Sequence, residues 1–330
     1  MLDLSPVSAG ESSRDALLHT VDLAQRAEAL GYRRYWVAEH HNAGGIACSS
    51  PEVLVATIAS ATQRLRVGSG GVMLPNHSAL RVAETFRVLE ALHPGRIDLG
   101  VGRAPGTDKR TALLLRRAPE LLAEGGFEAQ LDELLRFLGP DPDPTVPFNA
   151  VKAVPIGVPS PEVWLLGASL ASARGAGERG LAYAYAHHFA PDGVAAALDV
   201  YRASFRPSAS WSSPRAVVAT AVVCAPTDAE AEDLATSGGL SFLRAGRGLR
   251  DLPLASVSEA KAYAYDEDER ALLAHARGRA FVGGRERVAG ALSDLVSTSG
   301  ADELLLTTMV HDHAARVRSY ELVAEAASLK

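Results

Sequence analysis

Histidine, glycine, arginine and serine residues gather in short segments, and each segment follows directly after a short apolar run. These segments are 39–42 (EHHN), 68–71 (GSGG), 75–77 (PNH), 102–106 (GRAPG), 167–169 (GAS) and 187–188 (HH). The carboxyl ends of parallel strands meet at one face of a protein, so residues that follow successive strands come together there. The pattern predicts one active face built from five successive strand ends.

An anion site is the first chemistry that these segments suggest. Ser169 and Ser172 mark the start of a helix, where backbone N–H groups and the helix dipole attract anions and hydroxyls add donors. Arg103, at the neighbouring strand end, adds a guanidinium that suits phosphate. The alternatives are that Ser169 only caps the helix and that Arg103 only forms a surface ion pair.

Two adjacent histidines, His40 and His41, supply the second kind of chemistry. Adjacent residues at a strand end point to opposite sides, so we expect one imidazole in the core and one at the mouth of the site. An imidazole at the mouth is a candidate acid or base near neutral pH. No third ligand has the spacing of a zinc site, so we expect no metal. Which of these two and of His187 and His188 face the pocket stays open.

Glycines after the third and fourth strands leave backbone without side chains. At Gly70 and Gly71 a flat ligand could lie against the chain, although a simple bulge is the alternative. The glycines of segment 100–106 (GVGRAPG) have nearly the spacing of a dinucleotide fingerprint. Arg103 and Pro105 interrupt the helix start that this fingerprint requires, so we expect no nicotinamide site.

Short apolar runs alternate with helical stretches along the whole chain, which is typical of βαβ units around a parallel sheet. The predicted strands are 2–4, 32–37, 65–68, 96–101, 163–166, 181–185, 217–224 and 304–307. Eight parallel strands in one chain of this length predict a closed (β/α)8 barrel of the TIM type, forming a single domain over 1–330.

Three long connections interrupt this alternation. Residues from about 139 to 161 are rich in Pro and Asp and are expected to form an irregular loop. Residues from about 246 to 283 are expected to form an insertion before the last helix–strand pair. With the loop 102–119, this insertion should form the walls of the pocket.

Composition narrows the classes of partner. The 330 residues carry a net charge of −6, with scattered Lys and Arg, so we expect no nucleic acid partner. No apolar run approaches the roughly 18 to 20 residues that cross a bilayer, and the start of the chain does not look like a secretion signal. We expect a cytoplasmic protein without membrane contact. Cys48 and Cys224 are too few for a disulfide framework and are expected to be ordinary buried thiols.

Six segments together resemble the luciferase-like flavin monooxygenases, in particular the subgroup often found beside natural-product pathways. The resemblance spans almost the whole chain and is weakest in the 246–283 insertion. Its segments are WVAEHHN, VGSGGVMLPNHSALRVAE, LEALHPGRIDLGVGRAPGTD, VWLLGASLASA, AHHFAP and ADELLLTT with HDHAARVRSYEL.

The resemblance implies a barrel, usually a homodimer, that takes reduced FMN from a separate flavin reductase. With O2 the flavin would form a C4a-peroxide that oxygenates a small organic substrate. Two alternatives remain: an oxidoreductase of the same superfamily that uses the deazaflavin F420, and a non-catalytic flavin-binding protein. A metal-dependent barrel hydrolase is disfavoured because its ligands are missing.

The resemblance also assigns roles to individual residues. His40 matches the histidine considered the catalytic base in luciferase. Arg103, Ser169 and Ser172 match phosphate-binding positions, and Ala168 stands where luciferase has an acidic residue, so only its backbone amide could serve. Gly70 and Gly71 match a non-prolyl cis peptide beneath the flavin ring. His187 falls where luciferase has an aromatic residue beside the ring.

Overall fold

The structure is a computed structural model that describes residues 1–115, 125–140 and 150–328. Parts of the predicted connections 102–119 and 139–161 lie outside these residues. Within the first connection, the chain forms a short helix, α4 (Lys109–Leu115).

Parallel strands form one nine-stranded sheet in the described part of the chain. Consecutive strands pair from β1 to β8, and β9 pairs with β7. The strands are β1 (Leu2–Asp3), β2 (Arg34–Val37), β3 (Arg66–Met73), β4 (Ile97–Gly102), β5 (Glu162–Gly167), β6 (Ala182–Ala186), β7 (Ala216–Ala225), β8 (Ala280–Gly284) and β9 (Glu303–Thr307).

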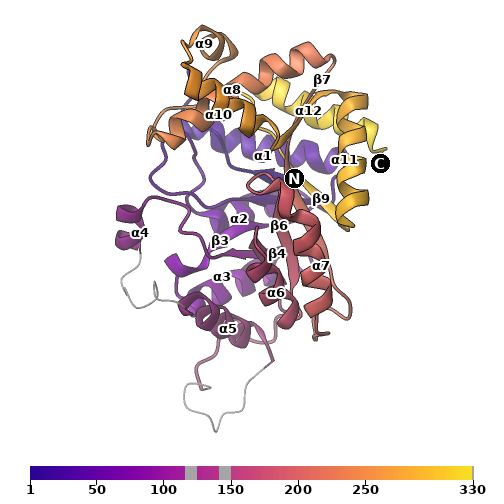
Figure 1. Ribbon diagram of the computed structural model, residues 1–330. Helices are drawn as coiled ribbons and strands as arrows, with labels where there is room; N and C mark the ends of the chain where they lie inside the picture. Colours follow the sequence, from indigo (N-terminus) through magenta and orange to yellow (C-terminus); the bar gives the residue numbers. More distant parts are fainter. Residues whose placement is uncertain (116–124, 141–149, 329–330) are drawn as a thin grey trace.

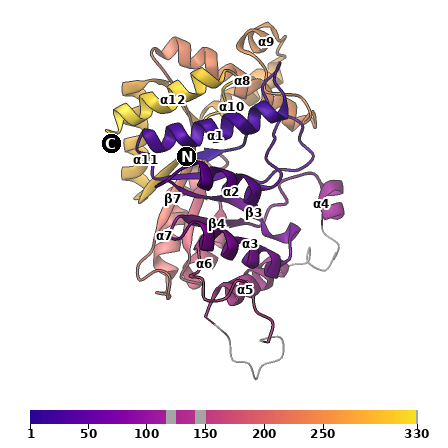
Figure 2. The same ribbon diagram turned by 180° about the vertical axis from the view of Figure 1, so that it is seen from behind.

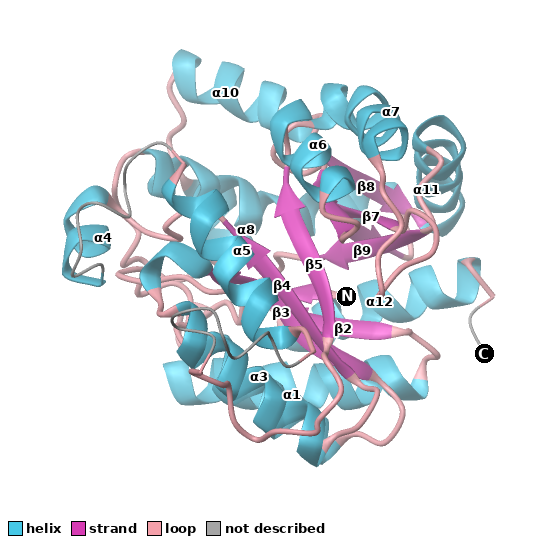
Figure 3. Cartoon of the chain, turned by 90° about the horizontal axis from the view of Figure 1, so that it is seen from below, coloured by secondary structure: helices cyan, strands magenta, loops and turns pink. Residues whose placement is uncertain are grey.

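Helices surround these strands (Figures 1 and 2), and the view from below shows the strands enclosed by them (Figure 3). Besides α4, the helices are α1 (Ser13–Ala29), α2 (Pro51–Ala61), α3 (Ala79–Leu92), α5 (Gly126–Leu138), α6 (Leu170–Glu178), α7 (Val194–Ser204), α8 (Asp228–Gly246), α9 (Val257–Ala262), α10 (Glu267–Arg277), α11 (Arg285–Ser299) and α12 (His313–Ala326). Short 3-10 turns, η1 (Leu74–Asn76) and η3 (Pro191–Gly193), follow β3 and β6.

The eight predicted strands are all present, and a ninth was not predicted. β9 pairs with the first half of β7, from Val217 to Ala221, and β8 pairs with its second half, from Ala221 to Ala225. β8 therefore extends the sheet beside the end of β7. No strand was assigned to the predicted insertion of about 246–283, and β8 lies at its end. The segment AFVGG is short and ends in two glycines, so its apolar pattern is weak.

Seven strands and β9 form the ring of a (β/α)8 barrel, which confirms the predicted fold. β1 lies beside β9, although the structure assigns no paired ladder between them in the described residues. Side-chain contacts join the two edges of the sheet: Arg34 of β2 lies 2.8 Å from Glu303 of β9. The interior of the barrel is thus continuous across the closure.

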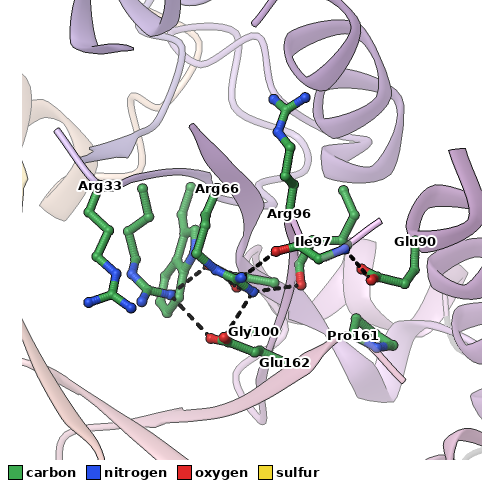
Figure 4. A network of polar contacts seen from close by, with 12 residues as sticks. Arg33, Arg66, Glu90, Arg96, Ile97, Gly100, Pro161 and Glu162 are labelled. Atoms are coloured by element: carbon green, nitrogen blue, oxygen red, sulfur yellow. Dashed lines mark hydrogen bonds and ion pairs between the residues drawn. The ribbon is translucent and has the colours of Figure 1, made fainter. Parts of the chain in front are cut away.

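Charged side chains fill the end of the barrel where the strands begin. Arg34 Nη1 lies 2.7 Å from one oxygen of Asp98, and Arg66 Nη2 lies 2.6 Å from the other. Arg66 also reaches Glu162 at 3.1 Å, and Figure 4 shows these two side chains converging from β3 and β5. Arg34 and Asp98 are almost completely buried, a placement that charges tolerate only when paired. This network closes the amino-terminal end of the barrel.

Large side chains follow in the next layer, and small ones after that. Alternate residues of a strand share a face, so Trp36, two residues after Arg34, also points inward. Its ring lies 5.4 Å from that of Trp164. Further toward the carboxyl ends, the inward positions hold Ala38, Gly102 and Ala186. The barrel is therefore filled below and lined by small residues at its mouth.

Helix α2 begins at Pro51. Ser50 precedes it, but the Ser50 side chain makes no capping hydrogen bond.

No helix in the described ranges is both long and apolar enough to cross a bilayer.

Candidate active site

The polar segments named from the sequence do converge. β2, β3, β4, β5 and β6 are parallel neighbours in that order, so their carboxyl ends lie side by side. The predicted meeting of five strand ends at one mouth is confirmed.

The Glu39 carboxylate is the centre of a hydrogen-bond cluster just beyond β2. It is fully buried and accepts hydrogen bonds from Met73 N at 2.8 Å and Asn76 Nδ2 at 3.0 Å. His41 Nε2 lies 2.7 Å from Oε1, and His77 Nε2 lies 3.0 Å from both oxygens. We call Glu39, His41, Asn76 and His77 the Glu39 cluster.

The protonation of this cluster follows from its contacts. Desolvation alone would raise the pKa of Glu39, but the hydrogen bonds and charge of His77 lower it below its ordinary value. Desolvation alone would lower the pKa of His77, but its hydrogen bond to Glu39 raises it. The two groups therefore stabilise each other as an ion pair.

The Glu39 cluster also ties three loops together. Asn76 Nδ2 donates to the Pro105 carbonyl at 3.0 Å, and His41 N donates to the Gly106 carbonyl at 3.1 Å. Thr107 Oγ1 donates to the His41 carbonyl at 2.8 Å. The loops after β2, β3 and β4 are thus held in one arrangement. Our sequence analysis gave Glu39 no role; a glutamate at the end of an apolar strand was the one available signal.

His40 is not part of the Glu39 cluster. Its backbone N–H donates to the Cys48 carbonyl at 2.9 Å, and its ring is half-buried. Nδ1 is buried and makes no hydrogen bond of normal geometry with any described residue, although the Ala38 backbone is close enough to act on the ring. Desolvation lowers the pKa of His40 and favours the neutral imidazole.

The prediction of one histidine in the core and one at the mouth is wrong. His40 and His41 are both half-buried, so the structure does not divide them into one core and one exposed residue. The buried carboxylate of Glu39 explains the difference, because it holds the His41 imidazole beside itself.

Gly70 and Gly71 are joined by a cis peptide bond, as the resemblance implied. The pairing of β3 with β4 also shifts register between Gly70 and Val72, so a bulge is present as well. A Cβ atom on Gly70 would lie 2.7 Å from Leu2 Cδ1, and one on Gly71 would lie 2.8 Å from the Gly100 carbonyl oxygen. Close packing therefore requires glycine at both positions and leaves backbone without side chains here.

Arg103 follows β4 and is exposed. The register pairs Val101 with Leu165, so Arg103 lies near Gly167 at the end of β5. Arg103 forms no surface ion pair with any residue that the structure describes, so that alternative is not supported.

Ser169 caps α6, as predicted. Its Oγ accepts a hydrogen bond from Ser172 N at 3.2 Å, while Ser169 N donates to Ser172 Oγ at 3.3 Å. Ser172 Oγ also lies 2.9 Å from Tyr183 Oη. The N–H groups of Leu170 and Ala171, in the first turn, have no acceptor within the helix. Backbone donors and the Ser169 hydroxyl thus follow β5, the strand next to the one that Arg103 follows.

His187 and His188 follow β6 and are both held in place. His187 is buried, with Nδ1 3.0 Å from Thr220 Oγ1, and its ring stacks on Phe281 at 5.7 Å between centroids. Phe281 belongs to β8, the strand that the sequence did not predict. Desolvation lowers the pKa of His187. His188 Nδ1 lies 2.9 Å from the Ala219 carbonyl oxygen.

Metal and thiol chemistry find no support in the described residues. Across 1–115, 125–140 and 150–328, no group of three or more His, Cys, Asp or Glu side chains is placed to hold a metal ion. Cys48 and Cys224 are free and buried, as expected from the sequence. Desolvation raises the pKa of both thiols, which disfavours the nucleophilic thiolate.

A (β/α)8 barrel with polar segments at successive strand ends is the architecture of an enzyme whose site lies at the barrel mouth. The family model described as "Luciferase-like monooxygenase" matches residues 2–320, so the chain belongs to this family and is an enzyme of this class.

Individual relatives support the same assignment. A protein of Escherichia coli (strain K12) named "Luciferase-like monooxygenase" is 40% identical and covers 98% of this chain and 95% of its own. The "N-acetyl-S-alkylcysteine monooxygenase" of Bacillus subtilis (strain 168) is 35% identical over 99% of this chain and 97% of its own. The crystal structure of apo-MsnO8 superposes with a TM-score of 0.88 at 38% identity, covering 100% and 98%.

More distant structures share the fold alone. They include the oxygenating component of 3,6-diketocamphane monooxygenase from Pseudomonas putida in complex with FMN, with a TM-score of 0.70 at 20% identity over 99% of this chain and 96% of its own. They also include an F420-dependent secondary alcohol dehydrogenase, with a TM-score of 0.67 at 16% identity over 96% and 95%.

Proposed function

We propose that this enzyme binds reduced FMN from a separate flavin reductase and uses O2 to oxygenate a small organic substrate. One observation carries the proposal: the desolvated His40 after β2, the bare Gly70–Gly71 backbone of β3 and Arg103 after β4 follow three neighbouring strands at one barrel mouth, and Arg103 has no partner among the described residues. Arg103 suits the phosphate of a flavin, and the Gly70–Gly71 backbone suits its flat ring. His40 suits a proton acceptor at the site of oxygenation.

The start of α6 fits the phosphate of FMN. Arg103 supplies a guanidinium with no partner among the described residues, and the free N–H groups of Leu170 and Ala171 add donors. Ser169 Oγ accepts from Ser172 N and lies 3.1 Å from Ser172 Oγ, so its proton would have to turn from Ser172 to reach a phosphate oxygen. Ala168 precedes the cap and would contribute only its backbone.

The mouth fits a flat ring system. Gly70 and Gly71 present backbone, and the inward positions Ala38, Gly102 and Ala186 are small. His187 would face the edge of the ring, fixed by Thr220 and Phe281. Its lowered pKa keeps it neutral and leaves it as an aromatic contact.

Reduced flavin, when bound, would supply the electrons that activate O2. The chain would contribute exclusion of water, position and proton handling. Nδ1 of His40 is buried, so we assign proton transfer to Nε2. In the neutral imidazole that desolvation favours, an unprotonated Nε2 can take up a proton and return it.

The relatives suggest a first substrate class. N-acetyl-S-alkylcysteine, in the name of the Bacillus subtilis relative, is a thioether with one carboxylate. We propose a thioether of this kind as the first candidate substrate. We also propose a homodimer located in the cytoplasm, which sedimentation and cell fractionation would test.

Oxygen consumption tests the proposed function. Wild-type enzyme with chemically reduced FMN and N-acetyl-S-methylcysteine should yield oxygenated product in proportion to the oxygen consumed. His40→Asn should still bind FMN but release hydrogen peroxide in place of product, and His188→Asn is the matched control at another strand end. Product formation undiminished in His40→Asn would remove His40 from the mechanism.

Two alternative functions give different results. Tight binding of F420 without oxygen uptake would favour the F420-dependent oxidoreductase. Flavin binding with neither oxygenation nor hydride transfer would favour a storage protein.

A further inference from the structure

The segment after α8 reaches back across the barrel to the loop that follows His40. Arg250 O accepts a hydrogen bond from Gly45 N at 3.1 Å, and Asp251 Oδ1 accepts from Gly44 N at 3.2 Å. Leu254 exchanges backbone hydrogen bonds of 2.8 and 2.9 Å with the segment 7–9 near β1. Residues 250–254, which we call the crossing segment, are thus anchored at both ends beside the mouth.

Two glycines make this approach possible. A Cβ atom on Gly44 would lie 2.9 Å from the Asp251 carbonyl oxygen, and one on Gly45 would lie 2.6 Å from that of Leu252. Both distances are shorter than van der Waals contact, and both neighbours are backbone atoms that cannot rotate away. The contact between the loop and the crossing segment therefore depends on glycine at 44 and 45.

No acidic side chain pairs with Arg250 in the part of the chain that the structure describes. Nearby arginines are paired: Arg244 with Glu259 at 2.6 Å, and Arg247 with Glu269 at 2.9 Å. The Asp251 carboxylate next to Arg250 is occupied by Gly44 N. The exposed Arg250 guanidinium has neither a hydrogen bond nor an ion pair with any residue that the structure describes.

The crossing segment holds Arg250 against the loop that follows His40. The Arg250 guanidinium is close enough to contribute to lowering the pKa of the His40 imidazole, after the larger effect of desolvation. His40 and Arg250 are 210 positions apart in the chain, and the anchored crossing segment is what brings them together.

We propose that Arg250 binds a carboxylate of the organic substrate and so orients the substrate beside His40, an inference that rests on the proposed function. A guanidinium forms a planar, two-pronged hydrogen-bond pair with a carboxylate. The phosphate of FMN has its own donors on Arg103 and α6, at other strand ends. The Asp251 carboxylate beside Arg250 also disfavours a doubly charged phosphate there.

Binding of an acid and its ester tests this proposal without depending on turnover. Titration calorimetry would measure Kd for N-acetyl-S-methylcysteine and for its methyl ester, which lacks the negative charge. Wild-type enzyme should bind the acid more tightly. Arg250→Gln should weaken the affinity for the acid about 10- to 100-fold, as expected for loss of a charged hydrogen bond, and leave the affinity for the ester unchanged. Arg250→Lys should restore part of the affinity for the acid.

Arg270→Gln is the matched control, because Arg270 is an exposed arginine of the same insertion on α10. It should leave both affinities unchanged. The ratio of FMN to riboflavin affinity should stay the same in Arg250→Gln, which separates this site from the phosphate site. Equal losses for acid and ester, or no preference for the acid in wild-type enzyme, would overturn the proposal. Selective acid binding without oxygenation would instead contradict only the proposed function.

Discussion

The buried Glu39 carboxylate forms an ion pair with the half-buried His77, whose Nε2 lies 3.0 Å from both carboxylate oxygens. The two residues come from the ends of β2 and η1, and the pair holds the loops that surround the candidate site. Weakening this ion pair should therefore destabilise the barrel mouth. It should also affect the position of His40, which follows Glu39 in the chain.

Replacing Glu39 by Gln should destabilise the protein by about 1–3 kcal/mol, because the half-buried donors on Met73, Asn76 and His77 lose a charged, buried acceptor. Urea unfolding monitored by circular dichroism measures this change. Glu84→Gln is the control, since Glu84 pairs with the exposed Arg81 at 3.5 Å and should contribute less than about 1 kcal/mol. Equal effects of the two substitutions would contradict a special role for the Glu39 cluster.

The contribution of the ion pair should depend on pH. The raised pKa of His77 gives stability that is fully present below its ordinary value of 6.5 and is lost as pH rises through the raised value. The lowered pKa of Glu39 gives stability that is present above its ordinary value of 4.5 and is lost as pH falls through the lowered value. Both groups are charged at roughly pH 5.5, whereas His77 loses its proton toward about pH 8.5. The difference in unfolding free energy between wild type and Glu39→Gln should therefore be larger at about pH 5.5 than at about pH 8.5. A difference independent of pH would show that His77 is not charged in the pair.

Arg103→Ala should weaken the binding of FMN much more than that of riboflavin, which has the same ring system but no phosphate. Fluorescence titration with both flavins gives the two affinities. A loss of about 10-fold or more for FMN alone is expected for a charged phosphate contact. Arg110→Ala, an exposed arginine on α4, should change neither affinity. Parallel losses for FMN and riboflavin would refute the phosphate assignment.

Asp98→Ala should destabilise the barrel by about 3–5 kcal/mol, because it leaves the buried Arg34 and the half-buried Arg66 without their shared carboxylate. Glu162→Gln, with a more exposed carboxylate, should cost less. Chemical unfolding ranks the two variants. Flavin affinity of folded Asp98→Ala should be unchanged, since the network closes the end of the barrel opposite the mouth; a large loss of affinity would contradict this separation.

Gly45→Ala should loosen the crossing segment, because its new methyl group would lie 2.6 Å from the Leu252 carbonyl oxygen. Hydrogen exchange of residues 250–254 should become faster while that of β4 stays unchanged. Gly290→Ala is the control: this glycine lies in α11 with open space around it, so alanine should stabilise the helix by up to about 1 kcal/mol. Unchanged exchange in Gly45→Ala would show that the loop and the crossing segment are not coupled.

Much of the fold could be predicted because its signals are local. The apolar runs of β2 to β7 and the helical periodicity between them indicate parallel strands wherever they occur, and the order of the polar segments places their strand ends together. Ser169 at the start of α6 is also a local signal, and its capping hydrogen bond is present. β8 was not predicted because five residues ending in Gly283 and Gly284 carry little periodicity and acquire their partner only from β7.

The sequence by itself determined the barrel, the gathering of polar segments at its mouth and, through resemblance, the cis bond at Gly70–Gly71. Only the tertiary structure decided that Glu39 gathers His41, Asn76 and His77, and that Arg250, with no partner among the described residues, lies against the loop that follows His40. The physical reason is the range of the interactions. Backbone propensity and amphipathic patterns act over a few residues, whereas a buried carboxylate or an unbalanced guanidinium is defined by groups that folding brings from distant parts of the chain.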